Sequence, residues 1–112
     1  MTLSLELQGR EIAVDKNGNL AHLSDWSPEV AELLARQESI ELQEAHWEVL
    51  NVLRAFYEEY QLSPAMRVLV KQVGLKLGKD KGRSIYLMQL FPPSPAKLAS
   101  KIAGLPRPDN CL

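Results

Sequence analysis

The first twenty residues alternate between apolar and polar positions. In LSLELQGREIAV, every second residue of 3–7 is apolar, and the spacing resumes at Ile12 after a break at Gly9. A period of two is typical of a strand with one buried face, and glycine at the break favours a tight turn. The sequence therefore predicts a β-hairpin over about 3–20, with Gly18 in a second turn and room for a third extended piece near Leu20.

From residue 28 onward the apolar spacing changes to three and four, which is typical of amphipathic helices. The clearest stripe lies in the segment 44–60 and is predicted to face the core; its members are Trp47, Leu50, Leu53, Tyr57 and Tyr60. Four further helices are predicted: about 28–37, from the Ser63-Pro64 pair to residue 77, 84–90, and 95 to the stop at Gly104.

Three of these helices follow a Ser-Pro pair, at Ser27, Ser63 and Ser94. A serine hydroxyl can accept a hydrogen bond from an exposed N–H group of the first turn, and proline at the first helical position loses no hydrogen bond. We therefore expect each serine to cap the helix that follows it. Gln43, before the helix 44–60, is a poorer cap than serine or threonine.

Together the elements predict an α+β fold, with an N-terminal β-hairpin packed on a mainly helical bundle whose C-terminal half resembles a helix–turn–helix. Residues 1–104 form one compact domain in this interpretation. The 112 residues are enough for one modest core. No stretch approaches the roughly 18 apolar residues of a membrane span, and the N-terminus lacks the pattern of a signal peptide.

Charge is divided unequally between the two halves of the chain. Residues 1–60 carry four Lys/Arg against twelve Asp/Glu, a balance of −8, and residues 61–112 carry nine against two, a balance of +7. The basic side chains that could bind a nucleic acid or a protein partner are Arg67, Lys71, Lys76, Lys79, Lys81 and Arg83. A face that is merely solvated is an equally simple explanation, and a protein partner is favoured over DNA because SIYLMQLF is too apolar to read bases.

The chain ends in LPRPDNCL, where Cys111 is the only cysteine. Two prolines prevent a continuing helix, so residues 105–112 are predicted to form a mobile arm that could carry the thiol roughly 23–25 Å from Gly104. An exposed thiolate is a nucleophile that could take up the outer sulfur of a donor persulfide and deliver it elsewhere. Lys101 and Arg107 are candidates to stabilise the thiolate, and an incidental terminal cysteine is the alternative.

No metal site and no cofactor are predicted. The soft ligands His22, His46 and Cys111 lie in separate segments, and no glycine-rich phosphate loop is present. His46 is better explained as a hydrogen-bonded, partly buried residue beside Trp47. A single cysteine agrees with a reducing cytoplasm.

Four blocks carry a resemblance to a known family: HWEVLNVLRAFYEEY (46–60), SPAMRVLVK (63–71), GRSIYLMQLFPPSPAK (82–97) and KIAGLPRPDNCL (101–112). Their order and the cysteine in the next-to-last position resemble the TusE/DsrC family of sulfur-relay proteins, over essentially the whole chain. The resemblance implies a sulfurtransferase in the broad sense, in which Cys111 accepts a sulfane sulfur as a persulfide and passes it on.

The resemblance also implies partners. In the tRNA-thiolation branch these are a TusBCD-like donor complex and an acceptor enzyme that makes 2-thiouridine at the wobble position, which would bring the protein near tRNA. In the dissimilatory branch the partner is sulfite reductase, and a second cysteine stands eleven residues before the penultimate one. Ser100 occupies that position here, so the TusE-like branch is favoured. A helix–turn–helix nucleic-acid-binding regulator is the alternative from another class.

Overall fold

The computed structural model describes residues 3–108. Two strands, β1 (Leu3–Leu7) and β2 (Arg10–Val14), precede a 3-10 turn η1 (Leu23–Asp25) and five helices. The helices are α1 (Pro28–Gln37), α2 (Glu44–Tyr60), α3 (Met66–Leu77), α4 (Ser84–Leu90) and α5 (Pro95–Ile102). The α+β class predicted from the sequence is therefore confirmed.

The hairpin forms where the apolar alternation predicts it. The strands β1 and β2 pair antiparallel from Leu3 opposite Val14 to Leu7 opposite Arg10. Gln8 and Gly9 connect them, both with positive φ (51° and 80°), which suits the twist of a two-residue hairpin loop. Near Leu20 the predicted third extended piece is a single antiparallel bridge to Val14.

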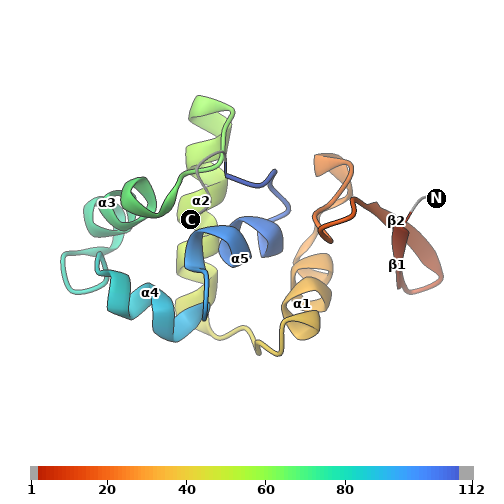
Figure 1. Cartoon of the computed structure of the whole chain (residues 1–112), viewed down its shortest axis with the longest axis horizontal. Coiled ribbons are helices and arrows are strands. Elements are labelled where there is room, and N and C mark those ends of the chain that lie inside the picture. The colour runs from red at the N-terminus through yellow and green to blue at the C-terminus, as the bar shows by residue number, and fades with distance from the viewer. Residues whose placement is uncertain (1–2, 109–112) are drawn as a thin grey trace.

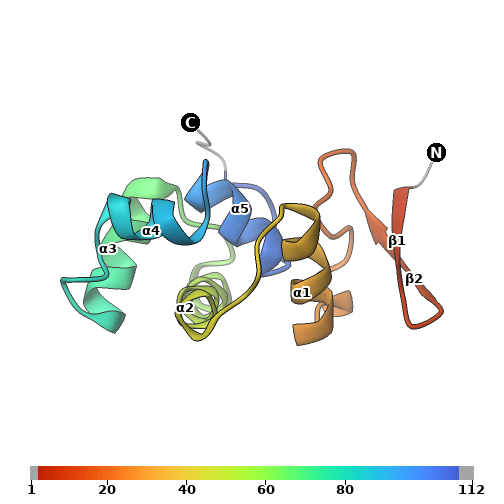
Figure 2. The same cartoon turned by 90° about the horizontal axis from the view of Figure 1, so that it is seen from below.

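The long helix α2 crosses the middle of the molecule, as Figure 1 shows, with α3 and α4 on one side and α1 on the other. The hairpin lies beyond α1, at the far end from α3 and α4 (Figure 2). This arrangement makes the molecule elongated, 41 × 26 × 22 Å. The short helix α5 packs against α1, α2, α3 and α4, so the element that leads into the C-terminal segment is the centre of the bundle.

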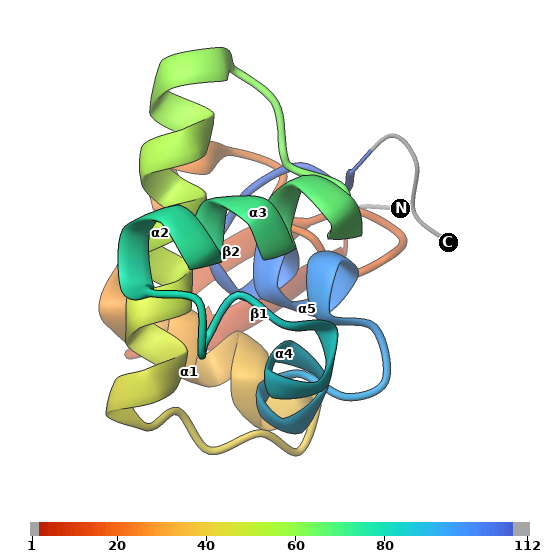
Figure 3. The same ribbon diagram turned by 90° about the vertical axis from the view of Figure 1, so that its left-hand side faces the viewer.

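The core follows the predicted helical faces with one correction. On α2, Leu50 and Leu53 are fully buried, and Trp47 and Tyr57 pack partly buried against the core. Tyr60 is 51% exposed, so the predicted stripe ends one turn early. The reason is that the C-terminal end of α2 extends past the neighbouring helices, as Figure 3 shows. Beyond it, Gln61 ends the helix with a left-handed φ of 57°.

Only one of the three serine caps forms as predicted. The Ser27 hydroxyl accepts the Val30 N–H at 3.3 Å. Ser94 makes no capping hydrogen bond, and α3 begins later than expected, with Ala65 at its N-cap. Ser63 instead donates its hydroxyl proton to the carbonyl of Pro106. A distant tertiary partner has replaced the local one.

His46 links two helices, as a hydrogen-bonded core histidine should. Its Nδ1 accepts the Gln43 N–H at 3.0 Å, which is the half of a capping box that the third helical residue contributes. Its Nε2 lies 2.9 Å from the carbonyl oxygen of Leu90 and therefore carries the proton and donates it. The ring also meets Phe91 edge-on, with centroids 5.1 Å apart.

Candidate functional site

The chain turns sharply where α5 ends. Gly104 has a φ of +76°, and a Cβ built on it would lie 2.3 Å from Cδ1 of Trp26. Only glycine meets both conditions, since an L-residue disfavours this φ and real Cβ atoms do not approach so closely. The predicted stop at Gly104 thus has a tertiary cause, which is close contact with Trp26.

The first residues of the predicted arm lie against the body. Leu105 is 3% exposed and belongs to the core, and its N–H donates to the Ser100 carbonyl at 2.9 Å. Pro106 and Arg107 are exposed, and Pro108 is buried. Cys111 and the end of the arm lie outside the described residues. From Pro108 to Cys111 the chain spans at most about 10–11 Å.

Lys101 and Arg107, the two cations proposed to support the thiol, have different surroundings. The Lys101 ammonium lies 2.7 Å from Oε1 of Glu38, in an ion pair whose lysine side chain is 11% exposed. Arg107 is exposed and lines a small cavity of about 180 Å³ together with Gln61, Leu62, Ser63 and Pro106. Arg107 is therefore available to a neighbouring thiolate, whereas Lys101 would first have to leave Glu38.

Arg54, which sequence reasoning did not select, lies beside the arm. Its guanidinium stacks 3.8 Å from the ring centroid of Trp26 and donates to the carbonyl of Ala103. Burial lowers the pKa of Arg54, and the nearby Glu58 carboxylate opposes that shift; an arginine nevertheless stays protonated. No spacing rule could have found this role, because the stacking partner and the carbonyl come from distant parts of the chain.

The predicted basic group lies on α3 and on the turn that leads from it into α4. Figure 3 turns α3, this turn and α4 toward the viewer. Five of its members are exposed: Arg67, Lys71, Lys76, Lys79 and Arg83. Lys81 is half-buried and lies 2.8 Å from Oε1 of Glu48, and this hydrogen bond raises the pKa of the lysine. The turn packs closely on α3, since a Cβ on Gly82 would lie 2.4 Å from the Gly74 Cα.

Sequence reasoning missed the apolar side chains exposed among these cations. Leu75 is 68% exposed and Ile85 66%, and Met88 and Val68 are also exposed. Their helical spacing is typical of a core face, so only packing could show that α3 and α4 leave them in contact with solvent.

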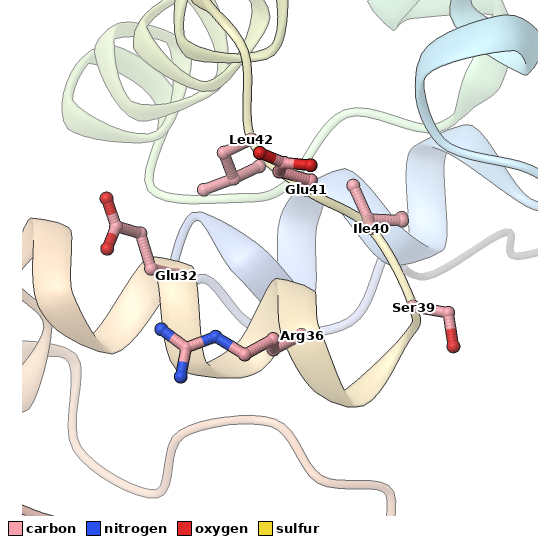
Figure 4. A pocket seen from close by; sticks show the side chains of 6 residues that line it. All are labelled: Glu32, Arg36, Ser39, Ile40, Glu41 and Leu42. Atoms are coloured by element: carbon pink, nitrogen blue, oxygen red, sulfur yellow. The ribbon is translucent and has the colours of Figure 1, made fainter.

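A larger cavity lies elsewhere. It has a volume of about 530 Å³ and opens between α1 and the segment leading into α2 (Figure 4), where Glu32, Arg36, Ser39, Ile40, Glu41 and Leu42 line it. The arm root meets α2 further along the helix, at Arg54 and Tyr57. Figure 4 shows Glu32 and Arg36 extending from the same face of α1. The cavity therefore holds none of the predicted site residues.

Among residues 3–108, no group of three or more His, Cys, Asp or Glu side chains could hold a metal ion. None of the helices in that range is long and apolar enough to cross a membrane.

The fold and the arm define a class: small α+β proteins in which a helical bundle holds the root of a C-terminal segment that carries a cysteine. A family model described as "DsrC like protein" matches residues 6–112, and the chain belongs to this family. It is 53% identical over 108 residues to the sulfurtransferase TusE homolog of Haemophilus influenzae, covering 96% of this chain and 99% of that protein. It is equally identical, with the same coverage, to the sulfurtransferase TusE of Yersinia pestis.

Two solved structures share the fold over nearly the whole chain. Allochromatium vinosum DsrC, determined by NMR, superposes with a TM-score of 0.90 at 53% identity and covers 100% of both chains. The oxidized gamma-subunit of the dissimilatory sulfite reductase (DsrC) from Archaeoglobus fulgidus gives a TM-score of 0.83 at 36% identity, covering 98% of this chain and 100% of that one. The predicted family is thus confirmed, and the protein is a sulfur-relay carrier that acts in sulfur transfer with partner proteins.

Proposed function

We propose that Cys111 carries the relayed sulfur as a persulfide. The observation that supports this most directly is the position of the only thiol, three residues beyond Pro108, in a chain whose relatives are named sulfurtransferases. In the proposed step, the Cys111 thiol first loses its proton to solvent. The thiolate then attacks the outer sulfur of a donor persulfide, R–S–SH. A new sulfur–sulfur bond forms as the donor's own breaks, and the donor leaves as a thiolate, with no net oxidation.

Mass spectrometry of the intact protein tests this step. After incubation with glutathione persulfide, the wild type should become heavier by one sulfur atom, and the added mass should disappear on treatment with dithiothreitol. Cys111→Ser should show no added sulfur. A wild type that takes up none, with this donor or with a persulfidated protein, would refute the proposal.

We further propose that the sulfur ends in the 2-thiolation of the tRNA wobble uridine, in the cytoplasm, with a TusBCD-like complex as donor and a tRNA 2-thiouridylase-like enzyme as acceptor. Ser100 supports this branch. The hydroxyl of Ser100 is fully buried without a hydrogen-bond partner among the described residues, and a serine cannot form the disulfide that the two-cysteine relatives are expected to use. Loss of 2-thiouridine in a deletion strain, restored by wild type and not by Cys111→Ser, is the expected result; full thiolation in the deletion strain would contradict it.

A second candidate is an accessory role with a dissimilatory sulfite reductase. It is favoured by similarity to a chain in the crystal structure of dissimilatory sulfite reductase I, with a TM-score of 0.76 at 29% identity. Co-purification with a sulfite reductase, together with unchanged tRNA thiolation in the deletion strain, would favour this role over the first.

We propose that the surface formed by α3, the turn that follows it and α4 docks a protein partner, with Arg67, Lys71, Lys76, Lys79, Lys81 and Arg83 as its charged contacts. The exposed Leu75 and Ile85 support a protein surface, because apolar side chains gain little from contact with phosphates. A nucleic-acid-binding regulator would instead bind duplex DNA at low salt with an affinity that falls steeply as salt rises. Fluorescence anisotropy with a labelled duplex separates the two, and salt-dependent binding that survives loss of Cys111 would favour the regulator.

A further inference from the structure

The backbone that follows α5 is held by side chains from four separate segments. Each donates a hydrogen bond to a carbonyl between residues 102 and 106. The pairs are Trp26 Nε1 to Ile102 at 2.9 Å, Arg54 Nη1 to Ala103, Asn19 Nδ2 to Leu105 at 3.4 Å, and Ser63 Oγ to Pro106. We call Asn19, Trp26, Arg54 and Ser63 the arm-root clamp.

The clamp exceeds what the end of a helix requires. The last carbonyls of a helix can be satisfied by water or by the turn that follows, and Gly104 already makes such a turn, with its N–H bonded to the Lys101 carbonyl at 3.0 Å. The four donors instead lie 43 to 86 positions away from their acceptors in the chain. Four donors on four carbonyls fix the path and direction of the chain.

The members of the clamp also support one another. Arg54 stacks on Trp26 at 3.8 Å, so each limits the other's rotation. Trp26 in turn packs against Gly104 so closely that no side chain fits there. Ser63 is 7% exposed and Asn19 5% exposed, and a buried polar group left without its partner is costly. The clamp therefore resists release at several points along residues 102–106.

A held root shortens the reach of the thiol. An arm released at Gly104 could carry Cys111 roughly 23–25 Å, whereas one that leaves at Pro108 carries it only about 10–11 Å. The sulfur must then be exchanged close to Pro108. Two small cavities flank the root there, of about 300 and 180 Å³, and Gln61 lines both. Leu62 is 50% exposed beside them.

We infer that Asn19, Trp26, Arg54 and Ser63 are positioning residues for sulfur transfer: they fix the point at which the Cys111 segment leaves the body, so that exchange with a protein partner takes place beside Leu62 and Ser63. This inference rests on the proposed function of Cys111. A clamp that only stabilises the fold is the competing explanation, and the two differ in what they predict for small and large sulfur donors.

The first measurement follows release of the root. In Ser63→Ala and in Trp26→Phe, one donor is lost and the rest of the clamp is kept. Hydrogen exchange at the Leu105 amide should become about fivefold faster, the equivalent of about 1 kcal/mol for one hydrogen bond. Exchange at core amides of α2, such as Leu53, should stay unchanged. Ser84→Ala, at an exposed serine on α4, is the matched control and should alter neither.

The second measurement compares two sulfur donors on the same variants. Uptake from glutathione persulfide should proceed at the wild-type rate, because a small donor reaches the thiol wherever the arm points. Uptake from a persulfidated protein, the TusBCD-like complex proposed as donor, should slow by the fraction of molecules in which the root is released. The exchange rate at Leu105 reports this fraction, which should be larger in the double variant Trp26→Phe/Ser63→Ala than in either single variant. Equal rates with the protein donor in the wild type and in a variant whose Leu105 amide has lost its protection would overturn the positioning role, as would unchanged exchange at Leu105. If the wild type took up sulfur from neither donor, the proposed function of Cys111 would fail first.

Discussion

The two ends of the described chain are held in opposite ways. At the N-terminal end, β1 and β2 pair with each other, and a two-residue loop with positive φ at Gln8 and Gly9 connects them. At the C-terminal end, residues 104–108 have no regular structure, and side chains from segments 43 to 86 positions away hold their carbonyls and those before them. The hairpin lies at the edge of the molecule (Figure 1), whereas the arm root lies against its central helices.

The difference separates local from long-range support in this fold. A hairpin needs only a turn and an alternating pattern, and both are local properties of its own residues. The arm root depends on residues whose local sequence gives no sign of the role, such as Ser63 and Arg54. The region that presents the thiol in the proposed function is therefore held by contacts from several distant segments.

The largest expected effect falls on the arm itself. Cys111→Ser should abolish sulfur uptake from every donor, because the hydroxyl cannot form a persulfide. Its thermal midpoint should equal that of the wild type within error, since the change lies beyond the clamped residues. Intact mass after persulfide treatment, together with a thermal melt, checks both statements. Residual uptake by the variant would show that another group carries the sulfur.

Substitution of two glycines with positive φ, Gly9 and Gly104, allows a direct comparison of the hairpin with the arm root. Gly9→Ala in the hairpin should lower the free energy of unfolding by about 1 kcal/mol, the cost of a left-handed backbone for an L-residue, since nothing lies within 4 Å of the new Cβ. Gly104→Ala carries the same backbone cost, and contact with Trp26 should add about 1–3 kcal/mol. Urea unfolding measures both, and equal losses would contradict the close packing at the root.

A smaller effect is expected at Lys101, which joins α5 to the end of α1. Lys101→Met should cost about 1–3 kcal/mol, because the Glu38 carboxylate loses a charged hydrogen bond in a largely buried setting. The matched control is Lys97→Met, an exposed lysine on α5, which should be nearly neutral. The reactivity of Cys111 against pH should be unchanged in Lys101→Met. If the pH dependence of Cys111 reactivity shifted while the stability stayed unchanged, the Lys101 ammonium would instead act at the thiol.

The smallest effect is expected at Lys81, remote from both ends. Its hydrogen bond to Glu48 raises the pKa above the ordinary value of 10.5, so the charged form is favoured by folding. The stabilisation is therefore fully present below pH 10.5 and is lost as the pH rises through the folded pKa. Thermal melts of wild type and Lys81→Met should differ slightly by a constant amount at neutral pH and converge above pH 10.5. Melts that diverge above pH 10.5 would contradict the raised pKa of Lys81.

Several features of the fold could be predicted because they depend on neighbours in the chain. The bounds of α1, α2 and α4 follow from apolar spacing and from Pro28, and those of the hairpin from alternation around Gly9. Ser27 caps its helix as expected. Ser63 carries the same local signal, yet it donates to Pro106, since a carbonyl brought near by folding offered a better partner than its own helix.

The features of the candidate site also fall into two groups: those that the sequence contains and those that only folding brings together. The lone Cys111, its place next to last in the chain and the breaks at Gly104 and Pro106 are properties of the sequence. They suggest a sulfur carrier, and the family resemblance of four sequence blocks made this the prediction. Where that arm leaves the body was decided by tertiary structure alone. The clamp brings together residues from four segments, and no local pattern encodes contacts that exist only once the core has packed α2 and α5 together.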